Sequence, residues 1–325
     1  MCLENNEDII EAEAGKRDSS VPQVFTVSGD IAGHRLDFAL SRLMGISRGF
    51  SQKLIKHGRL DLVPQRRIKP SIKVSDGDIM KVMVPPIESL DLEPQDVPFD
   101  VVYSDQDIIV VNKPAGLVVH PAPGHWTGTL VHGLLYRFPD MGNLNGVQRP
   151  GIVHRLDSTT SGLMVVARNG LAQEGLFRDF KGRRVEKEYL ALCYGIPASG
   201  KGEIRYPIGR DPFNRMRMAV TEDGRDAWTD YSTIWSIKGY TLLRCRIHTG
   251  RTHQIRVHMQ SVRCPLVGDR LYAPSRKSPF GEDRVFLHSW KLSFFHPRTK
   301  EKMAFSCPLP EELALFLKSL KDKEN

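Results

Sequence analysis

The segment "PPIESLDLEPQDVP", residues 85–98, limits how this chain can fold more than any other, because it cannot continue a regular element. Its prolines lack the backbone N–H that helix interiors and central strands require. It also marks a change of charge. Residues 31–81 carry eleven Lys/Arg against four Asp/Glu, whereas residues 88–107 carry seven acidic side chains and no Lys or Arg. A linker between two different domains is therefore expected here.

This division predicts four segments in a chain of 325 residues. Residues 1–20 hold six acidic and two basic side chains and predict a disordered tail. Residues 21–86 form a small basic domain, residues 87–98 the linker, and residues 99–325 a larger domain. The N-terminus has no continuous apolar stretch of the kind found in secretory signals, and no run approaches the roughly 18 apolar residues of a membrane span. The five cysteines are scattered without a Cys-x-x-Cys pair, so we expect a reducing, cytoplasmic location and no membrane contact.

The basic domain shows two helical patterns and a turn. Apolar residues recur at helical spacing in "GHRLDFALSRLMG", and Ser47 can begin a second helix, "SRGFSQKLIKHG", that Gly58 ends. Asp76-Gly77 predicts a tight turn between two extended stretches that pair with each other as a hairpin. The exposed helix faces would carry Arg42, Arg48, Lys53, Lys56 and Arg59. With a net charge of +8 and a pI of about 9.2, this block indicates a nucleic acid partner, the alternative being a solvated basic face without a partner.

The larger domain begins with two predicted strands, residues 101–103 and 108–111, around an acidic turn. Its most informative stretch is "GIVHRLDSTTSGLMVVARN", in which Leu163–Ala167 predicts a buried strand. Asp157 precedes that strand in a Ser/Thr-rich loop, where a carboxylate can simply cap the turn. His154 and Arg155 beside it, and the basic cluster "HTGRTHQIRVHMQ" about a hundred residues later, favour a functional site instead.

The histidines do not predict a metal site. His248, His253 and His258 are spaced by five residues, which does not bring them onto one helix face and alternates them across a strand. His120 and His132 read as polar loop residues without a role. We therefore expect no metal ion and no nucleotide cofactor.

The basic domain resembles the S4 RNA-binding domain of the α-L type. The matching features are the "RLD" opening, the "SR" helix start, the "LIKHG" ending and the stretch "KPSIKVSDGD"; the segment "LVPQRR" replaces the usual Asn-Gly turn. The resemblance implies an RNA-binding surface on the two helices. Its contacts would come from Arg35, Arg42, Arg48, Lys53 and Lys56.

Residues from about 96 to 310 resemble the pseudouridine synthases of the RluA/RluD type. The motifs that match, in the family's order, are "NKPAGLVVHPAPGHWTGTLVHGLLY", "RPGIVHRLDSTTSGLMVVAR", "EKEYLALCYG", "TGRTHQIRVHM", "GDRLY" and "LHSWKLSFFHPRT". The resemblance implies an α/β (α+β) fold with a mixed, largely antiparallel sheet flanked by helices. It also implies a cofactor-free isomerisation of uridine, in which the N1–C1′ bond breaks and the uracil rejoins through C5. The chain departs from the family's pattern at His132-Gly133 and at Ser158.

The resemblance also implies roles for single residues. Asp157 would be the catalytic aspartate, paired with Arg256, while Tyr189 would stack on the base; whether Asp157 attacks C1′, adds to C6 or acts as a base stays open. Arg155 would enter the space that the flipped uridine leaves, with His154 and Arg251 as further RNA contacts. The bland alternatives are a core aromatic for Tyr189 and a surface ion pair for Arg256.

The leading prediction is therefore an RNA pseudouridine synthase, expected to act as a monomer on structured large-subunit (23S) ribosomal RNA. Transfer RNA is the alternative substrate. A non-catalytic RNA-binding assembly factor is the alternative from another class, and a metal-dependent nuclease would need clustered acidic ligands that the key loop lacks.

Overall fold

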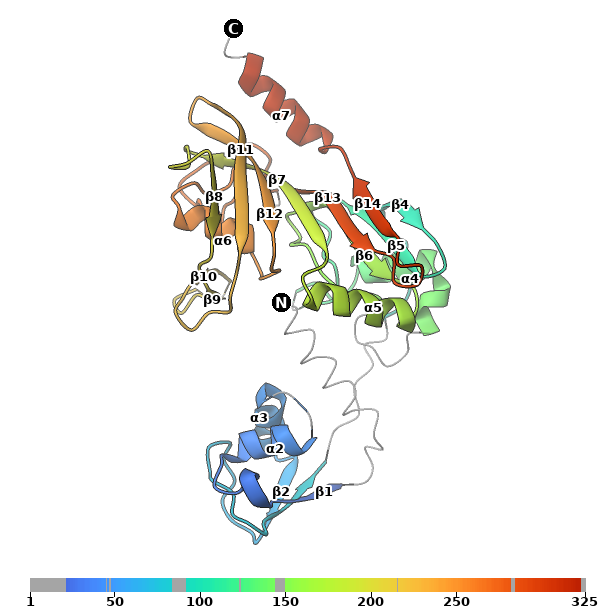
Figure 1. Cartoon of the computed structure of the whole chain (residues 1–325), viewed down its shortest axis with the longest axis vertical. Coiled ribbons are helices and arrows are strands. Elements are labelled where there is room, and N and C mark those ends of the chain that lie inside the picture. Colours follow the sequence, from blue (N-terminus) through green and yellow to red (C-terminus); the bar gives the residue numbers. More distant parts are fainter. Residues whose placement is uncertain are drawn as a thin grey trace. The chain divides into compact units, whose positions relative to one another are not determined.

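The computed structural model describes residues 22–44, 46, 48–83, 92–122, 124–143, 150–214, 216–281 and 284–322. The described residues form two compact units (Figure 1), the first extending to Met83 and the second beginning at Leu92. The predicted tail, residues 87–91 of the predicted linker and the side chain of Lys53 lie outside the described residues. Among the helices within the described part, none combines the length and apolar character that a bilayer crossing needs.

The first unit contains a three-stranded antiparallel sheet in the order β1-β3-β2 and two helices. Its elements are β1 (Gln23–Thr26), the 3-10 turn η1 (Gly29–Ile31), α2 (Leu36–Met44), α3 (Arg48–Lys56), β2 (Leu60–Val63) and β3 (Ile79–Val82). Both predicted helices are confirmed, and Leu40 and Leu54 are buried with Met80 of the sheet in one core. Gly58 follows α3 with φ +65°, which glycine adopts without strain.

The predicted pairing across Asp76-Gly77 was wrong. The turn exists, with φ +81° at Gly77, but β3 pairs with β1 and β2 rather than with the residues before the turn. The backbone of those residues is already bonded elsewhere: Ile72 O accepts from Leu36 N–H at 2.7 Å and Val74 N–H donates to His34 O at 2.9 Å. The stretch thus runs along the start of α2 and cannot join the sheet.

The second unit is built on a nine-stranded sheet in the order β4-β5-β6-β13-β7-β12-β11-β8, with β14 also paired to β13. Its strands are β4 (Asp100–Ser104), β5 (Ile108–Lys113), β6 (Ser161–Ala167), β7 (Glu186–Tyr194), β8 (Lys201–Ile204), β11 (Thr229–Ile237), β12 (Tyr240–Ile247), β13 (Leu287–Phe295) and β14 (Lys302–Ser306), with a separate hairpin of β9 (Ile208–Arg210) and β10 (Met218–Val220). Only β6 and β13 pair in parallel among these strands. This confirms the predicted mixed, largely antiparallel α+β fold, and both strands predicted before and after the acidic turn are present.

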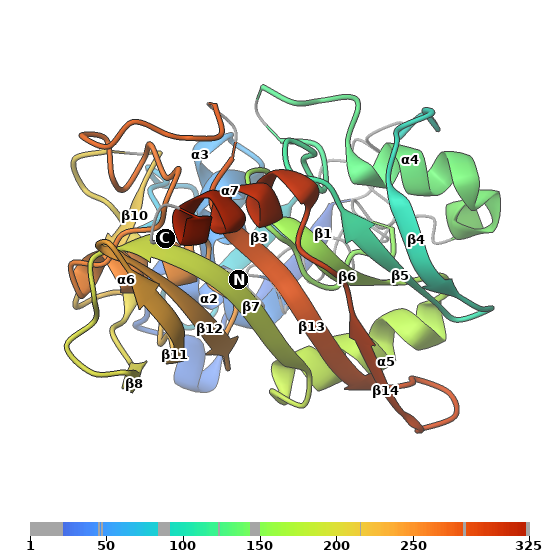
Figure 2. The same ribbon diagram turned by 90° about the horizontal axis from the view of Figure 1, so that it is seen from above.

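Four helices cover the two faces of this sheet. They are α4 (Leu130–Arg137), α5 (Gly170–Lys181), α6 (Gln254–Ser261) and α7 (Glu311–Asp322), with a 3-10 turn η2 (Pro139–Asn143) after α4. One face packs against α4 and α6, and the other against α5 and α7. In Figure 2, β13 and β7 run side by side in the middle of the sheet. Because both faces are covered, every residue of β6 is buried, as its apolar run predicted.

The departure from the family at His132-Gly133 has a local explanation. The prediction that His132 is a loop residue without a role was wrong: it lies in α4 and completes a capping box there, with its Nδ1 2.7 Å from Thr129 Oγ1. A Cβ at Gly133 would lie 2.9 Å from side-chain atoms of Val97 and Phe99, so glycine lets this part of the predicted linker pack on α4.

Gly162 lies in the parallel pairing of β6 and β13, opposite Ser289. Its φ is +114°, and a Cβ there would lie 2.4 Å from Ser289 O and 2.6 Å from Ser289 N. We expect Gly162→Ala to lower the free energy of unfolding by about 2–4 kcal/mol, through backbone strain and overpacking. Urea denaturation measures this loss.

Gly170→Ala is the matched control. Nothing lies within 4 Å of a Cβ there, and the residue begins α5, so alanine should change stability by less than about 1 kcal/mol. Equal effects of the two substitutions would contradict the assignment.

Candidate active site

Asp157 lies in the loop before β6, and main-chain contacts hold that loop in place. Asp157 O accepts from Thr160 N–H at 3.1 Å, and Ser158 O accepts from Gly116 N–H at 2.8 Å. The fully buried Lys113 donates from Nζ to the carbonyl oxygens of Pro114, Leu117 and Ser158, at 2.7, 2.8 and 3.2 Å. The loop therefore has a fixed conformation on the sheet.

Lys113 is a residue that the sequence reasoning missed. Burial lowers the pKa of Lys113 to about 7, and the charge of Asp157 opposes that shift. Three accepting carbonyl oxygens also favour the ammonium form. Its motif was recognised, but the contact of Lys113 with the Asp157 loop goes to one carbonyl group, Ser158 O, 45 residues away. Such a long-range contact leaves no periodic signal in the sequence.

A pocket with an empty volume of about 460 Å³ opens over this loop. It is lined by residues from four separate parts of the chain: the Asp157 loop, Tyr189 on β7, the segment from Ile247 to Ile255, and Leu287 on β13. The fold thus brings Asp157, Tyr189, Arg155 and Arg251 together around one space, as the sequence motifs had grouped them.

Arg256 connects the pocket carboxylate to a second, buried carboxylate. Its Nη1 donates to Asp157 Oδ2 at 3.4 Å, while Nε and Nη2 donate to the two oxygens of Asp269 at 2.7 and 2.9 Å. Its Cζ lies 5.0 Å from the centre of the Tyr272 ring. Arg256 and Asp269 are both buried, so the alternative of a surface ion pair for Arg256 does not hold.

Asp269 is the second residue that sequence reasoning missed. It lies in the recognised "GDRLY" motif, and its Oδ1 also accepts from the N–H groups of Leu271 and Tyr272, each at 3.1 Å. These bonds fix the carboxylate, and its two bonds to Arg256 then fix the guanidinium. The motif order alone did not reveal that Asp157 shares its arginine.

The charge of Asp157 is maintained by its surroundings. Burial alone raises the pKa of Asp157, but the nearby His253, Arg256 and Arg155 lower it more, so the net pKa lies below its ordinary value. The pKa of His253 is itself lowered, first of all by burial. Asp157 is therefore a carboxylate at neutral pH, in a site where most of its contacts are with protein rather than water.

Tyr189 is both a core residue and a pocket residue. It is buried on β7, where its neighbours across the sheet are Cys245 and Ser289. Burial raises the pKa of Tyr189 far above its ordinary value, and the charge of Asp157 raises it further. The phenol is therefore neutral, and its ring forms one wall of the pocket that Asp157 faces.

His154 is not brought to the pocket. Its Nε2 accepts from Val165 N–H at 3.1 Å, its ring stacks on Phe180 with centroids 4.6 Å apart, and burial lowers its pKa to about 3. These contacts favour a structural role on the face of the sheet that α5 covers. Arg155, the next residue, turns toward the pocket, where its Nη1 lies 3.4 Å from His120 Nε2.

In the first unit, the buried Asp37 organises two of the predicted RNA contacts. Arg35 forms two bonds with its carboxylate, at 3.1 and 3.0 Å, while Arg48 and Gln52 donate to it at 3.2 and 2.7 Å. Both arginines remain about half exposed. Arg42 and Lys56 are exposed as predicted.

The three histidines that were considered as metal ligands, His248, His253 and His258, each have a different hydrogen-bond partner. His248 Nε2 lies 2.7 Å from Asp230 Oδ2, His253 Nδ1 lies 2.9 Å from Tyr272 Oη, and His258 Nε2 lies 3.0 Å from Tyr206 O. They do not converge on one point where a metal ion could sit.

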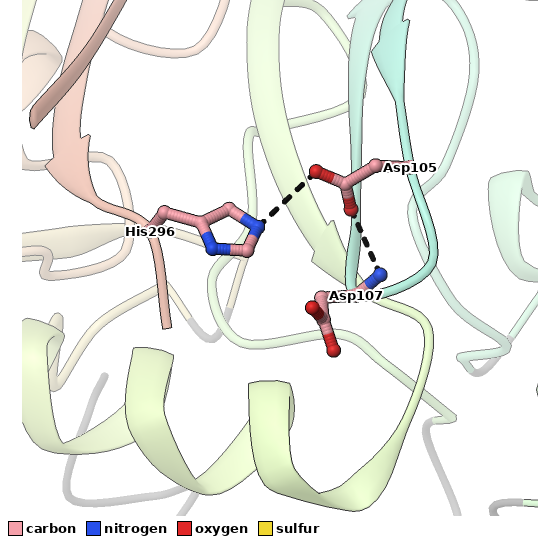
Figure 3. A group of neighbouring side chains, drawn as sticks. All are labelled: Asp105, Asp107 and His296. Atoms are coloured by element: carbon pink, nitrogen blue, oxygen red, sulfur yellow. Dashed lines mark hydrogen bonds and ion pairs between the residues drawn. The ribbon is translucent and has the colours of Figure 1, made fainter. Parts of the chain in front are cut away.

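A different group, Asp105, Asp107 and His296, has the composition of a metal site (Figure 3). His296 Nε2 lies 3.1 Å from Asp105 Oδ2. Arg298, however, already donates to both oxygens of Asp107, at 2.7 and 2.6 Å, and Asn169 donates to one of them at 2.8 Å. The carboxylates are thus used to join the β4–β5 turn to the β13–β14 turn.

Comparison with known proteins gives a consistent result. The family model described as RNA pseudouridylate synthase matches residues 107–261. A Bacillus subtilis protein named as an uncharacterized RNA pseudouridine synthase is 42% identical over 297 residues, which cover 91% of this chain and 97% of that protein. The ribosomal large subunit pseudouridine synthase D of Xanthomonas campestris is 41% identical over 317 residues, or 94% of each chain. The solved structure of human RNA pseudouridylate synthase domain containing 1 matches with a TM-score of 0.51 and 28% identity, over 70% of this chain and 96% of that chain.

Removing Arg256 should leave two carboxylates without their cation. We expect Arg256→Met to lower the free energy of unfolding at pH 7 by about 3–5 kcal/mol. The deficit should shrink between pH 7 and pH 4. In the variant, burial without the guanidinium raises the pKa of Asp157, so that protonation as the pH falls removes an unpaired charge and adds stability. In the wild type the pKa of Asp157 is lowered, so that protonation of the same group can only remove stability. Urea denaturation at several pH values measures both effects.

Arg246→Met is the control, because Arg246 forms an exposed pair with Glu186 at 3.2 Å. It should change the free energy of unfolding by less than about 1 kcal/mol at either pH. A deficit for Arg256→Met as small as that of the control would show that the buried pair contributes nothing.

Proposed function

The chain belongs to the RNA pseudouridylate synthase family, and from this premise we propose that its substrate is a uridine of large-subunit (23S) ribosomal RNA and that the isomerisation depends on Asp157. The observation that carries the residue assignment is the ion pair at 3.4 Å between the buried Arg256 and the partly buried Asp157, which lines a pocket together with Tyr189. Two kinds of support favour ribosomal RNA. Relatives named as ribosomal large subunit pseudouridine synthase D cover more than nine-tenths of this chain, and the first unit presents basic side chains.

The proposed chemistry needs few groups. The N1–C1′ bond of the uridine breaks, the uracil turns while it stays in the pocket, and a C5–C1′ bond replaces the lost one. A carboxylate that is already ionised can act on the sugar or on C6 without first losing a proton, and Arg256 keeps Asp157 in that form.

The aromatic and cationic groups around Asp157 suit a flipped nucleoside. A uridine must leave its stack to be reached, at a cost of a few kcal/mol. The ring of Tyr189 offers a surface for the extruded base, and its neutral phenol can take part in moving the C5 proton. Arg155 at the pocket edge has a planar guanidinium that can occupy the vacated position and contact phosphate.

The first unit is proposed as an S4-type RNA-binding domain. Asp37 holds Arg35 and Arg48 in fixed positions while their guanidinium groups remain about half exposed. Such groups can contact phosphates with little loss of side-chain freedom. As predicted from the sequence, we propose that the protein acts as a monomer in the cytoplasm.

Asp157→Asn tests the catalytic assignment. The amide has the same shape but no charge, so we expect pseudouridine formation in a 23S transcript to fall at least about 1,000-fold, with RNA affinity close to that of the wild type. Primer extension after carbodiimide treatment measures the product, and filter binding measures the affinity.

Asp140→Asn is the matched control, since Asp140 is an exposed carboxylate paired with Arg168, and it should retain wild-type activity. Full activity of Asp157→Asn would exclude the catalytic role. Activity on transfer RNA transcripts alone would favour the alternative substrate, and binding without turnover in the wild type would favour an assembly factor.

Arg48→Ala tests the RNA-binding role of the first unit. Losing one phosphate contact should weaken binding and reduce the slope of log affinity against log salt by about 1, while kcat at saturating RNA stays unchanged. Arg184→Ala is the control, because Arg184 is similarly exposed, at 49% against 51% for Arg48, and pairs with Asp179 in the second unit. An unchanged slope for Arg48→Ala would remove Arg48 from the RNA surface.

A further inference from the structure

The hairpin of β9 and β10 exposes an aromatic residue at its tip. Phe213 is 98% exposed and Met216 is 76% exposed, in the loop between Arg210 and Met218. A single exposed leucine or valine is ordinary on a protein surface, but a phenylalanine with its whole ring in water is not. The tip therefore indicates a contact with another molecule.

The exposure does not arise from a loose loop. Asp211 Oδ1 accepts from the N–H groups of Phe213 and Asn214, at 2.9 and 3.2 Å, and Asn214 Oδ1 accepts from Met216 N–H at 3.0 Å. Asp211 N–H donates in turn to Arg217 O at 3.1 Å. These are the side-chain bonds of a defined turn, and they fix the backbone at Phe213 and Asn214 while the ring of Phe213 is exposed.

The base of the hairpin is anchored beside the candidate active site. Tyr272 Oη accepts from Met218 N–H at 2.9 Å and lies 3.1 Å from Met218 O and 2.9 Å from His253 Nδ1. The guanidinium carbons of Arg217 and Arg256 lie 5.1 and 5.0 Å from the centre of the same ring. Tyr272 thus contacts the hairpin through Met218 and Arg217, and the catalytic pair through Arg256.

The charge around the hairpin favours RNA over a protein partner. Residues 205–220 contain four arginines and one acidic residue. At the foot of this segment, Arg205 lies over the ring of Trp228 at 3.9 Å, and Trp228 stacks on His248 at 3.8 Å. Aromatic rings alternating with guanidinium groups are typical of surfaces that bind unpaired nucleotides.

We propose that the β9–β10 hairpin is a separate RNA contact, in which Phe213 stacks on an unpaired base of the substrate and Tyr272 connects this contact to Arg256. The inference rests on the proposed function, because it takes RNA as the substrate. It adds a recognition element outside the pocket and a route by which binding at the tip reaches the arginine that pairs with Asp157.

Phe213 substitutions in the full chain test the stacking. With an unmodified 23S transcript as the probe, Phe213→Ala should raise the Kd between about 5- and 150-fold, the range for losing one base–aromatic stack. Phe213→Trp should restore binding, and Phe213→Leu should not, because leucine offers apolar area without a ring. Ile196→Ala, at an exposed position of 67% elsewhere on the second unit, is the control and should bind as the wild type does.

The outcomes separate this inference from the proposed function. A Phe213→Ala variant with wild-type Kd, or a Phe213→Leu variant that restores binding fully, overturns the stacking contact, even if Asp157→Asn abolishes turnover. A wild-type protein that binds the transcript without forming pseudouridine overturns the proposed function, while its Kd series still decides the role of Phe213.

A double-mutant cycle tests the connection through Tyr272. Tyr272→Phe keeps the ring but removes the hydroxyl that bonds to Met218. If the hairpin depends on that anchor, Phe213→Ala should weaken binding less in the Tyr272→Phe background than in the wild type, and kcat at saturating RNA should fall in Tyr272→Phe. Additive effects on Kd together with an unchanged kcat would show that the hairpin acts independently of Tyr272. Thermal melts of each variant confirm that the comparison is between folded proteins.

Discussion

The structure of the pocket depends on one guanidinium shared between two carboxylates. Asp269 is buried and takes Nε and Nη2 of Arg256 with good geometry, which leaves only Nη1 for Asp157. A buried arginine with a single partner could rotate toward it, but here the second partner fixes its orientation. Arg256 therefore makes its shorter bonds to Asp269, which has the structural role. Asp157 is stabilised by the charge of Arg256 through one longer contact. If Asp157 is the catalytic carboxylate that we propose, the single long contact leaves its second oxygen, Oδ1, without a bond to Arg256.

The sheet is what brings these groups together. Tyr189 and Leu287 lie on the adjacent strands β7 and β13, and the Asp157 loop enters β6 beside β13. Arg256 and His253 come from the start of α6, where His253 has a left-handed backbone conformation with φ +57°. A positive φ is uncommon for a residue other than glycine, although histidine adopts it more readily than most. The pocket thus lies beside the parallel pair β6–β13, the antiparallel pair β13–β7 and the start of α6.

Much of this arrangement could be predicted from the sequence, and the misses have physical reasons. Periodicity predicted both helices of the first unit and the buried strand of β6, since each depends on local pattern. The strand pairing across Asp76-Gly77 failed because backbone groups of residues 72–74 bond to the start of α2, a long-range choice that no local pattern records. Asp269 and Lys113 were missed because their roles come from contacts across the sheet and its loops, and neither stands in a run of similar residues. His154 was grouped with Arg155 by sequence proximity, although His154 packs on Phe180 of α5 while Arg155 lines the pocket.

The position of β13 in the sheet has a consequence for how the protein is made. This strand, Leu287–Phe295, lies between β6 and β7, both of which emerge from the ribosome long before it. Until it arrives, β6 and β7 each present an open hydrogen-bonding edge, and the wall of the pocket formed by Leu287 does not exist. A nascent chain therefore cannot assemble a working site piece by piece during translation. The pocket is therefore completed only after β13 has been synthesised, and until then the open strand edges of the incomplete sheet favour aggregation.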